Sequence, residues 1–275
     1  MDKKFGPAIE AIKSGEVDLL KSLVARDPSL AGRSFAFDHP TLLQFLVLCG
    51  IDFPDKIASA RVLIDAGADI DEPLRAAGGT GHLELAELLL DAGANINGDG
   101  RWSPLEEALY FGPPRMIDLL ISRGASIHNL RIAAGMGRVD IMKTMFDEDG
   151  SLKPEAGTIQ WPFSPKDLSD NYTGQDVVNN AFIFACRHNR IAAAEFLLDK
   201  GAEIDAMPPG FDYRGTGLHA AAISGHREMV DFLLNRGATI DIRDKKVNST
   251  PAGWAEHAGH HEIQNYLESL AVGRA

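Results

Sequence analysis

Apolar residues recur along this chain with the 3.6-residue period of amphipathic helices, in blocks that resemble one another. Three segments show the block clearly: GHLELAELLLDAGA at 81–94, GPPRMIDLLISRGA at 112–125 and GHREMVDFLLNRGA at 225–238. Each opens with glycine, places apolar residues at helical spacing and closes on Gly-Ala twelve positions later. Residues 189–202 fit the same frame, with asparagine in place of the first glycine. The pattern predicts an all-α chain built from repeated helical units.

A second, shorter helix is predicted upstream of each block, as in EPLRAAGGTG at 72–81 and TGLHAAAISG at 216–225. Prolines such as Pro73 and Pro104 fit the first turn of these helices, where the missing N–H has no partner inside the helix. Paired small residues allow neighbouring helices to approach closely. We count eight predicted helix pairs, beginning near residues 7, 41, 72, 103, 128, 180, 216 and 250.

These blocks resemble the ankyrin repeat, in which a Thr-Pro-Leu-His start and paired alanines precede a Gly-His step, a leucine-rich helix and Gly-Ala-Asp. The best matches are residues 216–221 (TGLHAA), Gly225-His226 and Gly67-Ala68-Asp69. The last repeat is similar to the closing repeats of bacterial ankyrin proteins. The resemblance implies one solenoid domain over 1–275, with an N-terminal cap repeat at 7–30 and a C-terminal cap repeat at 250–270.

The chain departs from the family pattern in two ways. The resemblance implies a β-hairpin finger between consecutive repeats, but 68–71 and 125–128 are too short to form one, so two fingers are expected to be missing. Fingers are expected before Ser103, Thr216 and Thr250. Conversely, 151–177 is an insertion whose prolines and glycines oppose a long regular element.

The insertion is too apolar for a free linker, because it contains Ile159, Trp161 and Phe163. Loops of this length inside a compact domain are usually functional or disordered. We therefore predict a flap that packs on the solenoid.

The resemblance assigns the two residues before each mid-repeat glycine, and the finger tips, to a concave groove. Together with the flap aromatics, these positions give the candidate binding residues: Trp102, Tyr110, Phe111, Met136, Trp161, Phe163, Arg187, His188, Asp212, Tyr213 and Arg214. Exposed aromatic and arginine side chains are typical of protein recognition surfaces. The leading hypothesis is therefore a scaffold that binds a protein or peptide. The alternative for these aromatics is that the flap folds over them and simply covers them.

The competing functional hypothesis is a small-molecule binder or atypical enzyme with a pocket under the 151–177 flap. His188 would be its acid–base group, with Tyr213 and Glu106 as further candidates. The sequence contains no phosphate-binding loop, nucleophile elbow or Cys-x-x-Cys pair, and we expect no cofactor and no metal. His82, His219, His226 and His260 occupy family positions that imply hydrogen bonds to backbone between repeats.

The net charge restricts the possible classes of partner, and cysteine usage bears on the cellular compartment. The net charge is −12, and such an acidic surface is a poor match for nucleic acid or an anionic membrane. The start of the chain has no apolar signal region and no apolar run is long enough to span a bilayer, so we expect a cytoplasmic monomer. Cys49 and Cys186 are predicted to be reduced, buried thiols.

Overall fold

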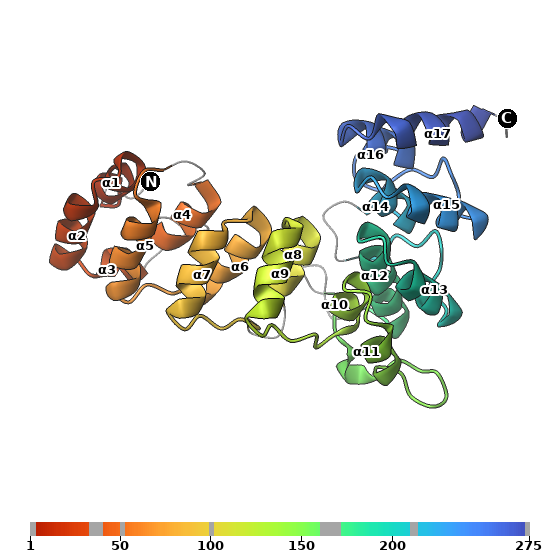
Figure 1. Ribbon diagram of the computed structural model, residues 1–275, viewed down its shortest axis with the longest axis horizontal. Coiled ribbons are helices and arrows are strands. Elements are labelled where there is room, and N and C mark those ends of the chain that lie inside the picture. The colour runs from red at the N-terminus through yellow and green to blue at the C-terminus, as the bar shows by residue number, and fades with distance from the viewer. Residues whose placement is uncertain are drawn as a thin grey trace. The chain divides into compact units, whose positions relative to one another are not determined.

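The protein is all α in the parts of the chain that the computed structural model describes, which are residues 4–32, 41–49, 53–98, 102–159, 172–209 and 214–272 (Figure 1). These residues contain 17 α-helices and a short 3₁₀ helix at Pro154–Ala156. Their only strand-like pairing is an isolated antiparallel bridge between Phe146 and Leu152. The chain divides into two compact units, Met1–Ser126 and Ile127–Ala275. The all-α prediction is confirmed.

The first unit stacks its helices in pairs (Figure 1). The inner helices α1, α4, α6 and α8 pack in succession, and each is paired with an outer helix. Residues 68–70 alone separate Gly67 from the next inner helix, as the missing finger requires. The helices are α1 (Gly6–Ser14), α2 (Val17–Arg26), α3 (Ser29–Gly32), α4 (Leu42–Cys49), α5 (Lys56–Asp65), α6 (Asp71–Thr80), α7 (Leu83–Asp91), α8 (Pro104–Phe111) and α9 (Pro114–Ser122).

The second unit repeats this arrangement around its own core. The inner helices α10, α12, α14 and α16 pack in succession, and each contacts the outer helix that follows it. The helices are α10 (Leu130–Gly135), α11 (Val139–Thr144), α12 (Gly174–Arg187), α13 (Ile191–Asp199), α14 (Gly217–Ile223), α15 (Arg227–Asn235), α16 (Pro251–His257) and α17 (His261–Val272). Eight helix pairs are therefore present among the described residues, as predicted.

Hydroxyl N-caps start several inner helices. Ser103 forms a capping box with Glu106 at α8, and Thr41 exchanges equivalent bonds with Gln44 at α4. A capping box also shows that one predicted helix boundary is wrong. Thr173 forms a capping box with Asp176, so α12 begins at Gly174 and not near residue 180. The insertion is correspondingly shorter than 151–177.

A repeated side-chain bond joins neighbouring repeats at the residue that follows four of the Gly-Ala pairs. The backbone N–H at that position donates to an Asp or Asn oxygen of the preceding repeat, satisfying a backbone donor at the turn. The bonds are Asn95 to Asp71 (2.7 Å), Ser126 to Asn97 (2.8 Å), Glu203 to Asn179 (2.9 Å) and Thr239 to Asp205 (3.0 Å).

Histidine performs the structural task that the resemblance implied at two positions. His219 Nε2 bonds the carbonyl of Ser249 at 3.1 Å, and His226 Nε2 bonds the carbonyl of Arg187 at 2.9 Å. For His82 and His260 the same role stays a prediction.

The two cysteines differ in their surroundings. Cys186 is fully buried in the core of the second unit, as predicted, and burial raises the pKa of its thiol. Cys49 is exposed, so the prediction of a buried thiol there is wrong. It occupies the last residue of α4, where a side chain can point away from the stack.

Candidate functional site

The predicted site residues divide between the two units. Trp102, Tyr110 and Phe111 belong to the first unit, whereas Met136, Arg187, His188 and Arg214 belong to the second. The remaining candidates lie outside the described residues: Trp161, Phe163, Asp212 and Tyr213.

The aromatic residues around α8 form a stack, but only its outer member is exposed. Trp102 and Tyr110 are 4% and 8% exposed, so the expectation of solvent-facing side chains is wrong for both. Phe111 is 48% exposed. The Tyr110 ring contacts Trp102 edge to face at 6.2 Å between centroids and Phe111 at 4.3 Å. Edge-to-face packing of this kind adds stability beyond simple burial.

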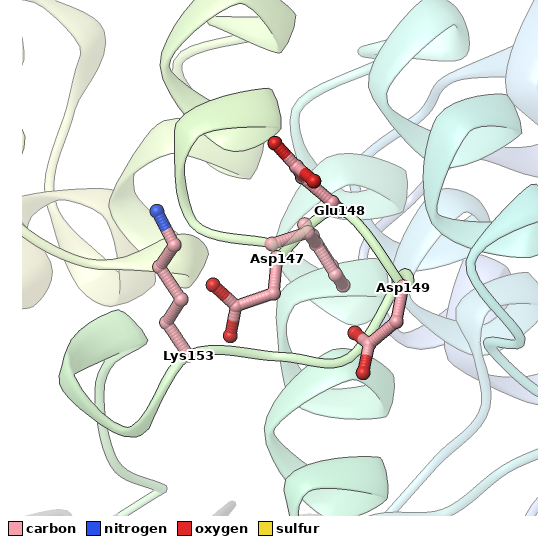
Figure 2. A pocket seen from close by; sticks show the side chains of 5 residues that line it. Asp147, Glu148, Asp149 and Lys153 are labelled. Carbon is pink, nitrogen blue, oxygen red and sulfur yellow. The ribbon is translucent and has the colours of Figure 1, made fainter.

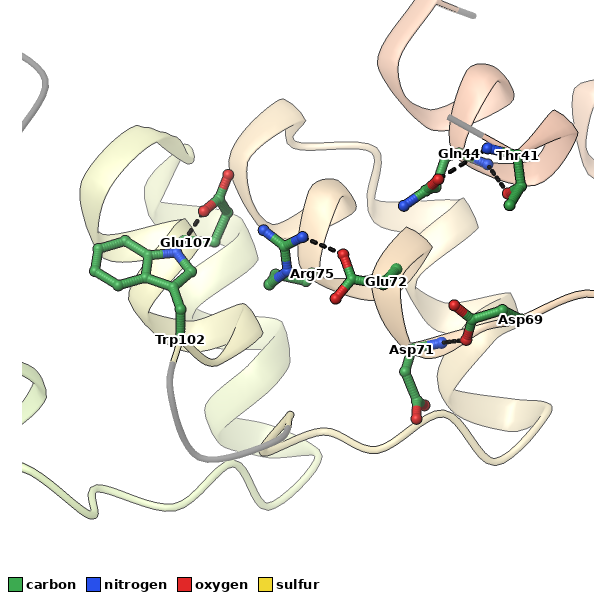
Figure 3. Close-up of polar contacts among 8 residues, drawn as sticks. All are labelled: Thr41, Gln44, Asp69, Asp71, Glu72, Arg75, Trp102 and Glu107. Atoms are coloured by element: carbon green, nitrogen blue, oxygen red, sulfur yellow. Dashed lines mark hydrogen bonds and ion pairs between the residues drawn. The ribbon is translucent and has the colours of Figure 1, made fainter. Parts of the chain in front are cut away.

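A hydrogen bond to a buried carboxylate explains why Trp102 lies inside. Its indole N–H donates to Glu107 Oε2 at 2.5 Å, and Glu107 is only 7% exposed (Figure 3). Burial raises the pKa of Glu107, and it outweighs the opposing effects of the Trp102 hydrogen bond and the Arg75 charge. Figure 3 shows the Arg75 guanidinium between the carboxylates of Glu107 and Glu72, and Arg75 forms an ion pair with Glu72.

Two glycines of α6 make room for this carboxylate. A Cβ on Gly78 would lie 2.6 Å from the carbonyl oxygen of Pro104, and one on Gly79 would lie 3.0 Å from Glu107 Oε1. Side chains at these positions would therefore force α6 and α8 apart. Glu107 is buried because the backbones of α6 and α8 approach closely, and not because of its position in the periodic pattern of α8.

Exposed side chains occupy one equivalent position on three successive inner helices. The residues immediately before the mid-repeat glycines, Cys49, Thr80 and Phe111, are all exposed. Leu48, beside Cys49, is 48% exposed. We call these four residues the helix-end row. Sequence reasoning considered this position only from α8 onward and so missed Leu48 and Thr80, although the glycine spacing could have identified both.

Most candidate residues of the second unit are only partly exposed. Met136, Arg187 and His188 are partly exposed at the ends of α10 and α12, and Arg214 is exposed before α14. The carbonyl of Arg187 accepts the His226 bond that joins two repeats. Arg187 therefore also has a structural role through its backbone.

Glu106, one of the candidate catalytic residues, is part of a helix cap. Glu106 is fully buried, and its carboxylate accepts the N–H of Ser103 at 2.7 Å. Its own N–H donates to the Ser103 hydroxyl at 3.2 Å, so this carboxyl group caps α8. His188 is partly exposed at the end of α12, and a catalytic role for it stays a prediction.

The beginning of the insertion packs on the second unit. Ala156 and Ile159 are 1% and 0% exposed, and Ile159 belongs to the core of that unit. Gly157 has φ 125°, and a Cβ there would lie 2.8 Å from Asn129 Cβ. Packing on the solenoid is thus observed for Ala156 and Ile159. Residues 160–171, which include Trp161 and Phe163, lie outside the described part of the chain, so packing of the rest of the flap stays a prediction.

An open depression beside α11 is lined by Phe146, Lys153 and the acidic turn Asp147–Asp149 (Figure 2). Two of its polar side chains, Asp149 and Lys153, form local hydrogen bonds. Asp149 accepts the N–H and hydroxyl of Ser151 at 2.9 and 2.7 Å, and Lys153 donates to the carbonyl of Thr144 at 2.8 Å. Among all described residues, no group of three or more His, Cys, Asp or Glu is placed to hold a metal ion.

Sequence comparison agrees with this architecture. Residues 130–244 match the family model described as Ankyrin repeats (3 copies). Residues 130–244 therefore carry ankyrin repeats. Repeats of this family generally serve as protein-binding scaffolds. No helix in the described ranges of this ankyrin-repeat chain is long and apolar enough to cross a membrane.

Three curated relatives illustrate the similarity. The palmitoyltransferase Hip14 of Drosophila melanogaster is 32% identical over 101 residues, which are 37% of this chain and 14% of that protein. Human ankyrin repeat and KH domain-containing protein 1 is 30% identical over 120 residues, 44% of this chain and 4% of that protein. The Caenorhabditis elegans protein mask-1, also an ankyrin repeat and KH domain-containing protein, is 27% identical over 221 residues, 71% of this chain and 8% of that protein. The chain thus spans only a small part of each.

Proposed function

We propose that this ankyrin-repeat chain is a scaffold that binds a protein segment along the helix-end row of its first unit. The observation that carries the proposal is the exposure of Phe111 on a fixed base. Phe111 is 48% exposed, while its neighbours Tyr110 and Trp102 are buried and Trp102 is held by Glu107. A rigid, exposed aromatic ring offers binding area at little entropic cost.

The rest of the row complements this ring. Leu48 is exposed to the same extent, and the smaller Thr80 lies on the inner helix between them. Packed helices are about 8–10 Å apart, so the two apolar side chains are separated by two such spacings, roughly 20 Å. An extended segment of about six residues spans that distance. The expected partner is therefore an extended segment with an apolar residue near each end.

A peptide library selected against the immobilised full chain tests this function. Affinities of the selected peptides are then measured on Phe111→Ala and Leu48→Ala variants. Each change should weaken binding by roughly 1 kcal/mol or more, about fivefold, as for interface hot spots. The folded state should persist, because both side chains are half exposed.

Leu19→Ala is the matched control, because Leu19 is 42% exposed on the outer helix α2 of the same unit. Its removal deletes a similar exposed area away from the row and should leave affinity unchanged. Peptides that bind Phe111→Ala and Leu48→Ala as tightly as the unaltered chain would rule out the helix-end row as the binding surface.

A further inference from the structure

The turn between α15 and α16 is organised by one buried carboxylate. Asp244, 3% exposed, accepts the backbone N–H groups of Lys246, Val247 and Ser249, each at 2.8 Å. It also accepts the indole N–H of Trp254 at 3.1 Å. Burial alone would raise the pKa of Asp244, but these donors together lower it to about 2. The carboxylate is therefore ionised at neutral pH and fixes the turn around itself.

Neighbouring side chains anchor this turn to the repeat stack. The Ser249 carbonyl accepts from Asp244 N at 2.9 Å and bonds His219 Nε2 at 3.1 Å. The His219 and Trp254 rings meet edge to face at 4.9 Å between centroids. His219 is itself fully buried. The tip of the turn is thus presented on a preorganised base.

Basic side chains gather at this tip. Arg243, Lys245 and Lys246 are all exposed. The N–H of Lys245 donates to the carbonyl of Arg214 at 3.1 Å, which brings a fourth exposed cationic residue beside them. We call Arg214, Arg243, Lys245, Lys246 and Val247 the basic finger.

The finger stands out against the composition of the chain. The whole molecule carries a net charge of −12, yet the finger gathers cationic residues, and within residues 240–249 the only exposed carboxylate is that of Asp241. Val247 adds an apolar side chain at the tip that is 56% exposed. These residues form no continuous basic run in the sequence, because Arg214 is distant along the chain and Asp244 interrupts the others.

We propose that the basic finger is a docking site for an acidic peptide segment of a partner protein, with an apolar side chain of that segment resting on Val247. Carboxylates of the segment pair with the Arg and Lys side chains, and the preorganised turn limits the entropy lost on binding. This surface belongs to the second unit and does not depend on the helix-end row of the first.

The size of the finger favours a peptide over a nucleic acid. The Debye length is about 8 Å at physiological ionic strength, so a short segment responds mainly to the local positive charge. A nucleic acid extends its regularly spaced phosphates beyond the finger, over a molecule whose net charge is −12.

Fluorescence anisotropy with the full chain tests the proposal. The probe is a short dye-labelled peptide in which glutamates flank one leucine, and the control peptide has glutamines in their place. The Lys245→Glu/Lys246→Glu variant should bind the acidic probe at least about tenfold more weakly, because each reversal replaces an attraction by a repulsion. Lys245→Gln/Lys246→Gln should give a smaller loss in the same direction.

The matched control is Lys21→Glu/Lys143→Glu, which alters two exposed lysines on α2 and α11 and changes the net charge equally. It should change affinity by no more than about twofold, because neither lysine belongs to the basic finger and screening weakens the effect of charges outside the contact. Thermal melting checks that all variants are folded. Equal losses in the two Lys→Glu variants, binding of the glutamine peptide as tightly as the acidic one, or absence of binding would each overturn the proposal. Tighter binding of a single-stranded oligonucleotide of equal charge would also overturn it and assign the finger to nucleic acid.

Discussion

The indole of Trp102 is bonded to the carboxylate of Glu107, and both groups lie inside the first unit. Trp102 precedes α8 and Glu107 occupies its first turns, so the bond ties the incoming chain to the helix. This contact converts a predicted recognition residue into a structural one. It also leaves Phe111 as the member of the aromatic stack that reaches solvent.

Truncation of Trp102 should therefore be costly. Trp102→Ala should lower the free energy of unfolding by roughly 3–5 kcal/mol, as for other buried large aromatic residues. Trp102→Phe keeps an aromatic ring, although a smaller one, but removes the N–H and leaves Glu107 without that donor, so it should cost at least about 1–3 kcal/mol. Urea unfolding measures both. A loss below about 0.5 kcal/mol for Trp102→Ala would show that the side chain lies at the surface.

Replacement of Glu107 by glutamine should become more favourable as pH rises. Burial raises the pKa of Glu107 in the folded state, so the folded protein binds this proton more tightly than the unfolded chain. The stability that this group contributes is present below its unfolded pKa and is lost as pH rises through the folded pKa. Glutamine can still accept the Trp102 N–H and does not ionise.

The melting temperatures of Glu107→Gln and the unaltered chain should therefore be close at pH 4. Towards neutral pH, the melting temperature of the variant should rise relative to that of the unaltered chain. The control Glu84→Gln removes the charge of an exposed carboxylate on α7 and leaves the Trp102–Glu107 contact unchanged. A gap that stays constant with pH would show that Glu107 has an ordinary pKa.

Addition of one methyl group to α6 should disturb the stack. A Cβ at Gly78 would lie 2.6 Å from the Pro104 carbonyl oxygen, so Gly78→Ala should cost about 1–3 kcal/mol of stability through overpacking. Gly6→Ala is the control, because its Cβ meets nothing within 4 Å. That change should be neutral or stabilising by up to about 1 kcal/mol, since alanine favours helix. Similar unfolding curves for the two variants would contradict close packing of α6 on α8.

Local patterns were sufficient to predict the helix pairs and the two missing fingers. Helix periodicity and turn glycines are properties of short segments, and Gly67 followed so soon by Pro73 leaves no length for a hairpin. The boundary of α12 was placed too late because Thr173 and Asp176 were counted with the insertion, although their spacing is that of a capping box. The site was harder to predict, since exposure at the end of a helix depends on the neighbouring repeats.

The sequence by itself therefore determined the repeat, the all-α architecture and the positions at which inner helices end. Only the tertiary structure decided which residues at the helix ends are buried and which basic residues lie next to one another. Gly78 and Gly79 admit α8 so closely that Glu107 and Trp102 are covered, while Phe111, at the last residue of the same helix, stays half exposed. The bond from Lys245 to Arg214 likewise joins residues that are distant along the chain. Both outcomes depend on contacts between repeats, which the periodicity of a single repeat does not encode.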